Sequence, residues 1–227
     1  MDLFNDLEFV ESTHTYWLDG KRIPSMSSKI DLLYKKFDDK LIAPLSAAKH
    51  KTTESIIRAR WDDAKDLGIS IGNDSHIYGE VGGVKYTMFR EAINQYLLDL
   101  PSYYKIVARE LRMYSRKFWV AGTADLLLYN TLTNKYIIAD YKTNKDLFKT
   151  FNDDLYSPFS NYLNNPFNKY IVQLNGYQVM LEEAGIEVEA RHLIWVARRS
   201  NHSLYVKYNL PNETDNIKKH FINTLCH

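Results

Sequence analysis

The chain contains very little cysteine: Cys226 is the one thiol in 227 residues. A single thiol cannot form a disulfide within the chain, a thiolate zinc centre or an iron–sulfur cluster, so the sequence excludes these three. A chain without a disulfide framework is compatible with a reducing compartment.

Long apolar runs are also missing. No stretch approaches the roughly 18 apolar residues of a membrane span. The first six residues, MDLFND, are acidic and unlike a signal peptide. We therefore expect a cytoplasmic protein without a membrane partner.

The chain has no excess of either charge, with 29 Lys and Arg against 28 Asp and Glu and a net charge of +1. Any basic groove for nucleic acid must therefore come from local clustering. Aromatic side chains are plentiful, at 14% of the chain with 17 tyrosines. They can stack on bases, although most are expected in the core or on ordinary surface.

The most informative stretch has two strand-like segments, residues 120–129 and 136–141, joined by polar turn residues. Side chains alternate along a strand, so Asp140 and Lys142 are expected on one face, within reach of Asp125 on the neighbouring strand. Such charges are costly to bury unpaired. Two carboxylates beside an ammonium indicate a hard-cation site with a charge-stabilising group. The alternative is an exposed hairpin with solvated charges.

Residues 122–125 read Gly-Thr-Ala-Asp, and residues 140–143 read Asp-Tyr-Lys-Thr. This pair of motifs resembles the PD-(D/E)XK nuclease superfamily, specifically its RecB-like exonuclease branch. The resemblance implies that Asp125 is the first acid, Asp140 the second and Lys142 the lysine of the site. It also implies an α/β fold with a mixed central sheet flanked by helices, similar to the restriction-endonuclease core, and an N-terminal helical layer.

Two upstream positions are similar to further motifs of this branch. Gly72, His76 and Glu80 match a Gly-x-x-x-His-x-x-x-Glu helix, which makes His76 a candidate metal ligand. Glu110, in Ala-Arg-Glu-Leu, resembles the glutamate that precedes the Gly-Thr-Ala-Asp strand, and it would ligate or order the site. A structural histidine, and an exposed glutamate paired with a neighbouring arginine, remain the alternatives.

Residues 169–184 have the periodicity of a helix, with Tyr177 on its buried stripe and Gln173 four residues earlier. Gln-x-x-x-Tyr on the helix after the lysine strand is typical of the same branch. An ordinary core helix would explain Tyr177 but not a half-buried glutamine one turn before it. The resemblance implies that both side chains position the lysine strand or the DNA backbone.

The implied chemistry is metal-dependent hydrolysis of a phosphodiester bond. The resemblance implies Mg²⁺ or Mn²⁺ held by Asp125, Asp140 and the backbone carbonyl of Tyr141, with His76 completing a second site. Lys142 would orient the attacking water or neutralise the phosphorane.

Residues 8–24 predict a hairpin that turns at Asp19-Gly20, similar to the N-terminal hairpin of phage-type RecB-like exonucleases. Residues 38–66 predict two helices. We assign the basic and aromatic residues of this region to the second helix, as candidates for contacting DNA: Lys49, Lys51, Arg58, Arg60 and Trp61. The same residues also suit an ordinary exposed helix. The predicted division is an N-terminal hairpin and helical layer in residues 1–66 and a nuclease core in residues 67–227.

The sequence thus predicts a Mg²⁺- or Mn²⁺-dependent DNA exonuclease that acts on single-stranded DNA or linear ends. A recombination or replication protein is the expected partner besides DNA, and the host cytoplasm is the expected location if the chain is phage-encoded. Alternatives are a structure-specific endonuclease of the same fold and a catalytically silent DNA-binding module. Another class of hydrolase lacks support, because the sequence has no Gly-x-Ser-x-Gly, His-Glu-x-x-His or phosphate-loop motif.

Overall fold

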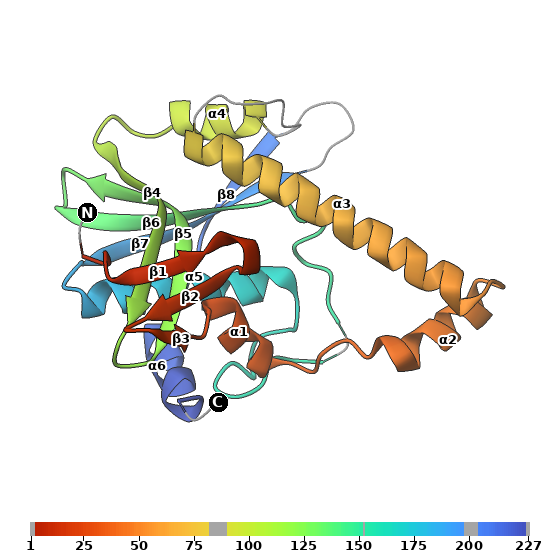
Figure 1. The fold of residues 1–227 in the computed structure, drawn as a ribbon. Coiled ribbons are helices and arrows are strands. Elements are labelled where there is room, and N and C mark those ends of the chain that lie inside the picture. The colour runs from red at the N-terminus through yellow and green to blue at the C-terminus, as the bar shows by residue number, and fades with distance from the viewer. Residues whose placement is uncertain (1–2, 82–89, 152, 198–203, 226–227) are drawn as a thin grey trace.

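The computed structural model describes residues 3–81, 90–151, 153–197 and 204–225, while the side chains of residues 72–81, 197 and 204 lie outside that description. Within these residues the fold is mixed α/β, as predicted, with a five-stranded and a three-stranded sheet (Figure 1). The strands are β1 (Leu7–Val10), β2 (Thr15–Leu18), β3 (Lys21–Ile23), β4 (Tyr104–Ser115), β5 (Val120–Asn130), β6 (Lys135–Lys142), β7 (Val188–Ala197) and β8 (Leu204–Asn209). The helices are α1 (Met26–Ile30), α2 (Asp39–Lys49), α3 (Glu54–Val81), α4 (Arg90–Leu98), α5 (Pro166–Glu183) and α6 (Thr214–Asn223), with 3-10 turns η1 (Glu11–Thr13) and η2 (Asp31–Leu33).

The five-stranded sheet has the order β4-β5-β6-β7-β8. Its neighbours are antiparallel except for β6 and β7, which are parallel. A parallel pair needs a crossover connection, and α5 supplies it. The tight turn between β5 and β6 ends at Asn134, which has a φ of 59° and accepts a 2.8 Å hydrogen bond from the hydroxyl of Tyr129. The strand–turn–strand predicted from the sequence is therefore confirmed.

The two faces of this sheet are covered by different helices. The main core lies between the sheet and α1, α5 and α6, and it takes Ile138 from β6. A second core lies on the opposite face with α4 and the end of α3, and it takes Ile137, Ala139 and Tyr141. The period-2 alternation of β6 therefore sends Asp140 and Lys142 toward the α5 side.

The N-terminal sheet is a meander of three strands, where the sequence predicted a single hairpin. The predicted turn at Asp19-Gly20 is confirmed, with φ values of 52° and 70°. Ser25 caps α1 by accepting a 3.1 Å hydrogen bond from the amide of Ser28. Tyr16 is buried in a small core beneath this sheet, whereas the imidazole of His14 is exposed.

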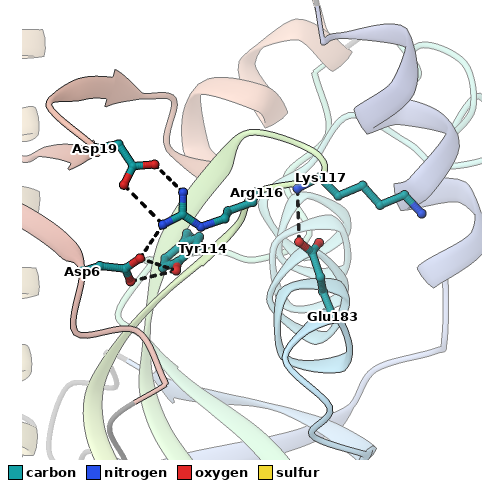
Figure 2. A network of polar contacts seen from close by, with 6 residues as sticks. All are labelled: Asp6, Asp19, Tyr114, Arg116, Lys117 and Glu183. Carbon is teal, nitrogen blue, oxygen red and sulfur yellow. Dashed lines mark hydrogen bonds and ion pairs between the residues drawn. The ribbon is translucent and has the colours of Figure 1, made fainter.

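A polar network fastens this meander to the turn between β4 and β5 (Figure 2). The guanidinium of Arg116 forms ion pairs with Asp6, before β1, and with Asp19, at the β2–β3 turn. The hydroxyl of Tyr114 donates to both carboxylate oxygens of Asp6, at 2.7 and 2.8 Å. The far side of the same turn is held by Glu183 of α5, which accepts the amide of Lys117 at 3.1 Å (Figure 2).

Helices α2 and α3 form a hairpin, and α2 with the adjoining half of α3 projects away from the sheets (Figure 1). Asp38 and Thr53 cap the two helices through the amides of Leu41 and Ile56. Helix α3 continues through residues 66 and 67, where the sequence suggested a domain boundary. None of the helices in the described residues has the length and apolar character needed to cross a bilayer.

Candidate active site

The candidate site lies where β5 and β6 face α5. Asp140 and Lys142 lie at the C-terminal end of strand β6. The register that pairs Leu126 with Ala139 places Asp125 of β5 beside them. Lys142 Nζ forms an ion pair with Oδ2 of Asp140. The structure thus brings together the two acids and the lysine that the sequence selected.

Both carboxylates are buried, with Asp125 4% exposed and Asp140 1% exposed. The backbone amide of Tyr141 donates to Oδ2 of Asp125 at 2.6 Å, which fixes that carboxylate against β6. Oδ2 of Asp140 has no hydrogen bond of normal geometry among the described residues, and Lys142 is the charged group that approaches it. The lysine ammonium is therefore the group that compensates this buried oxygen.

Opposing effects act on the charge of Lys142. Burial of the side chain lowers its pKa, but the carboxylates of Asp140 and Asp125 together outweigh burial, so the pKa of Lys142 is raised. The lysine is therefore an ammonium at neutral pH. Two carboxylates against one ammonium leave an excess of negative charge, and carboxylate oxygens are the ligands that Mg²⁺ and Mn²⁺ prefer.

Tyr170 of α5 lies beneath the lysine. The ammonium of Lys142 is 4.9 Å from the centre of its ring, and its hydroxyl donates to Oδ1 of Asn144 at 2.5 Å. Trp195 of β7 in turn donates to the backbone carbonyl of Asn144 at 2.8 Å. Only the tertiary structure shows that Tyr170 lies beside the site.

The Gly-Thr-Ala-Asp and Gln-x-x-x-Tyr motifs pack against each other. A Cβ atom added at Gly122 would lie 2.5 Å from a ring carbon of Tyr177, so only glycine lets this ring rest on β5. The hydroxyl of Tyr177 accepts a 2.7 Å hydrogen bond from Nε2 of Gln173. Burial raises the pKa of Tyr177 well above its usual value, and the negative charge of Asp140 adds to this. The tyrosine is therefore a neutral hydroxyl beside the acid pair.

Tyr16 of the N-terminal meander also reaches this region. Its hydroxyl is 2.8 Å from Oγ1 of Thr123, two residues before Asp125 on β5. Burial raises the pKa of Tyr16. Nothing in the sequence pattern indicated this contact with the Gly-Thr-Ala-Asp strand.

Glu110 lies on β4 level with Asp125, because Arg109 pairs with Leu126 and Leu111 with Ala124. Its φ of 47° marks a local break in the strand. In the described part of the chain, no three His, Cys, Asp or Glu side chains gather into a metal-binding group, and the role of Glu110 stays a prediction. The backbone of His76 belongs to α3, but its side chain lies outside the described residues.

The basic residues of the helical arm lie apart from the acid pair. Lys49 is in the last turn of α2 and Lys51 is in the turn that follows, which corrects their assignment to the second helix. Arg58 is on α3 about 20 Å, at 1.5 Å per residue, from Ile71, the last side chain described on that helix. Arg58 also forms an ion pair with Asp39 of α2, so its charge is already partly neutralised by a contact that joins the two helices of the hairpin. Arg60 is exposed, and Trp61 packs edge-on against Phe37 at 5.2 Å.

A polar depression of about 390 Å³ lies at the start of α6 and is lined by Asn212, Glu213, Thr214, Asp215, Asn216 and Lys219. It contains neither Asp125 nor Asp140, so it is separate from the candidate active site.

Comparison with known proteins adds little to this description. No protein-family model matches the chain, and no curated protein sequence matches it. A solved structure titled "Crystal structure of SSO0001" is similar over 88% of this chain and 83% of its own, with 13% identity and a TM-score of 0.35. A similarity this weak supports no conclusion about function.

Proposed function

We propose that this chain is a Mg²⁺- or Mn²⁺-dependent deoxyribonuclease, and that it acts as an exonuclease on single-stranded or linear DNA. The observation that carries the proposal is the convergence of Asp125, Asp140 and Lys142 from neighbouring strands into one buried cluster. This cluster lies beneath the helix that carries Gln173 and Tyr177.

The acid pair fits a divalent cation. The buried carboxylates of Asp125 and Asp140 together exceed the single positive charge of Lys142 beside them. The ion would be held by Asp125, Asp140 and the carbonyl of Tyr141, with His76 as a further ligand. Bound there, it would supply Lewis acidity and a bound water of lowered pKa.

The other residues of the site would neutralise charge on the phosphoryl group and hold the surrounding elements in place. Lys142 stays charged beside the acids, where an ammonium stabilises negative charge that develops on a phosphoryl group. Tyr170 limits the directions available to that ammonium. Tyr177 packs against Gly122 and accepts a hydrogen bond from Gln173, so it fixes α5 against β5, the strand that carries Asp125.

Asp140→Asn and Asp125→Asn test the proposal. Both variants should fold and lose cleavage of end-labelled linear single-stranded DNA in Mg²⁺, because ionised oxygens dominate affinity for this ion. Glu187→Gln is the control, since this carboxylate is exposed and pairs with Lys135 at the opposite end of β6. Wild-type cleavage should stop in a chelator, and a folded Asp140→Asn protein with unchanged activity would refute the assignment.

A further inference from the structure

Lys169, in the first turn of α5, packs against two aromatic rings. Its ammonium lies 3.3 Å from the ring centre of Tyr34 and 5.7 Å from that of Phe151. Among the described residues it forms no ion pair. Burial lowers its pKa, with Asp31 acting weakly in the opposite direction. The carboxylate of Asp31 accepts the hydroxyl of Tyr34 at 2.6 Å and forms its ion pair with Lys36, so it does not neutralise Lys169 directly. The half-buried ammonium of Lys169 can therefore still bind an anion.

This cation belongs to the same face of α5 as the candidate active site. Lys169, Gln173 and Tyr177 follow one another at intervals of four residues, which places them in one row, about 6 Å apart along the helix. Tyr170, which follows Lys169 in the chain, is the residue that lies beneath Lys142. A chain of phosphates that crosses the acid pair along this row therefore reaches Lys169.

The aromatic partners come from two other segments. Tyr34 follows η2, and Phe151 belongs to the stretch between β6 and α5. The two segments are joined by the amide of Tyr156, which donates to the carbonyl of Leu33 at 2.7 Å. Phe151 is 48% exposed, so much of its ring is open to a ligand.

We propose that Lys169, Tyr34 and Phe151 form a subsite for the nucleotide adjacent to the scissile phosphate of single-stranded DNA. Lys169 binds its phosphate and Phe151 stacks on its base. This inference rests on the proposed nuclease function, because the acid pair defines which phosphate is cleaved. Stacking on a protein ring requires a base whose face is free, so the subsite selects an unpaired strand.

Equilibrium binding of a fluorescein-labelled oligothymidylate, measured by anisotropy with EDTA present to prevent cleavage, tests the subsite. Lys169→Gln should weaken binding about 5-fold or more at low salt, and the slope of log affinity against log salt should decrease in magnitude by about 0.7. Phe151→Ala should weaken binding about 5-fold or more with the slope unchanged, and Phe151→Trp should retain it. Lys135→Gln removes the same charge at the far end of β6, and it should change affinity less than about 2-fold.

Thermal unfolding first establishes that every variant is folded. If Lys169→Gln and Phe151→Ala bind the strand as Lys135→Gln does, the subsite is wrong even when the wild type cleaves DNA. If binding depends on both residues but neither Mg²⁺ nor Mn²⁺ supports cleavage, the subsite stands and the nuclease proposal fails. An equal loss for Phe151→Ala on a blunt duplex of the same length would overturn the selection of an unpaired base.

Discussion

Lys142 compensates two buried carboxylates at once, so its removal affects both folding and chemistry. Its side chain is 15% exposed and that of Asp140 is 1% exposed. Lys142→Met leaves the carboxylates unopposed and should lower the free energy of unfolding by about 3 kcal/mol without divalent ions. Mg²⁺ or Mn²⁺ should recover part of that stability by binding the folded state. Single-turnover cleavage should slow by about 10²-fold or more.

Thermal unfolding with and without MnCl₂, together with single-turnover rates, measures these two effects separately. Lys135→Met is the control, because it breaks an exposed ion pair on the same strand. Cleavage at the wild-type rate by a folded Lys142→Met protein would show that the lysine stabilises the fold and takes no part in the chemistry.

Gly122 is required by the ring of Tyr177 rather than by backbone conformation. In Gly122→Ala the new methyl group would lie 2.5 Å from Cε1 of that ring. The ring is buried and cannot move aside, so we expect a loss of about 1–3 kcal/mol in the free energy of unfolding.

Urea unfolding measures the loss, and Gly68→Ala is a matched control. Gly68 is in α3, and a Cβ there meets nothing within 4 Å, so alanine should leave stability unchanged or raise it by up to about 1 kcal/mol. Combining Gly122→Ala with Tyr177→Ala should recover part of the packing loss, since the clash disappears with the ring. Strictly additive losses would show that the two residues do not interact.

At the scale of elements, the turn between β4 and β5 joins the N-terminal meander to the main sheet. Hydrogen bonding by Tyr114, and then by Arg116, lowers the pKa of Asp6, and hydrogen bonding by Arg116 lowers the pKa of Asp19. Groups with a depressed folded-state pKa stabilise the fold above their ordinary value of 3.8 and lose this effect as the pH falls through the folded-state pKa.

Arg116→Ala should therefore lower Tm modestly at about pH 7, and the difference from wild type should shrink below about pH 4. The effect is expected to be modest because the partners are about half exposed, and it should weaken in high salt. Lys117→Ala is the control, because this residue joins the network through its backbone amide while its side chain points away (Figure 2). A difference that stayed constant from about pH 3 to about pH 7 would assign the effect to packing instead of charge.

The α2–α3 hairpin determines the shape of the whole molecule beyond its sheets. It projects from the body while the distal half of α3 contacts the main sheet (Figure 1). We predict that linear single-stranded DNA is degraded progressively and that closed single-stranded circles resist, because the proposed exonuclease requires a free end. Gel analysis of both substrates measures this, and nicking of circles at a comparable rate would indicate an endonuclease.

Arg60→Glu tests whether the arm guides the strand, and its effect should be larger at low salt. It is a cleaner change than one at Arg58, which would also break the ion pair with Asp39 and loosen the hairpin.

Sequence alone determined the central strand pair and the residues of the acid cluster. Strand alternation fixes Asp140 and Lys142 on one face. The short β5–β6 turn brings Asp125 beside them independently of the rest of the fold. Helix α5 was also predictable from periodicity, and its start is set by the cap at Asn165, which accepts the amide of Asn168 at 2.9 Å. Local geometry decided all of these.

Tertiary structure alone decided which distant residues surround that cluster. Tyr170 lies beneath Lys142, and the ring of Tyr177 requires Gly122, through contacts between segments far apart in the chain. The same is true of the third strand of the meander and of the group formed by Tyr34, Phe151 and Lys169. The tertiary structure also decided the direction of the helical arm, and thereby the separation of its basic residues from the acids. Sequence periodicity records which side of an element is buried, but it carries no information about which other element buries it.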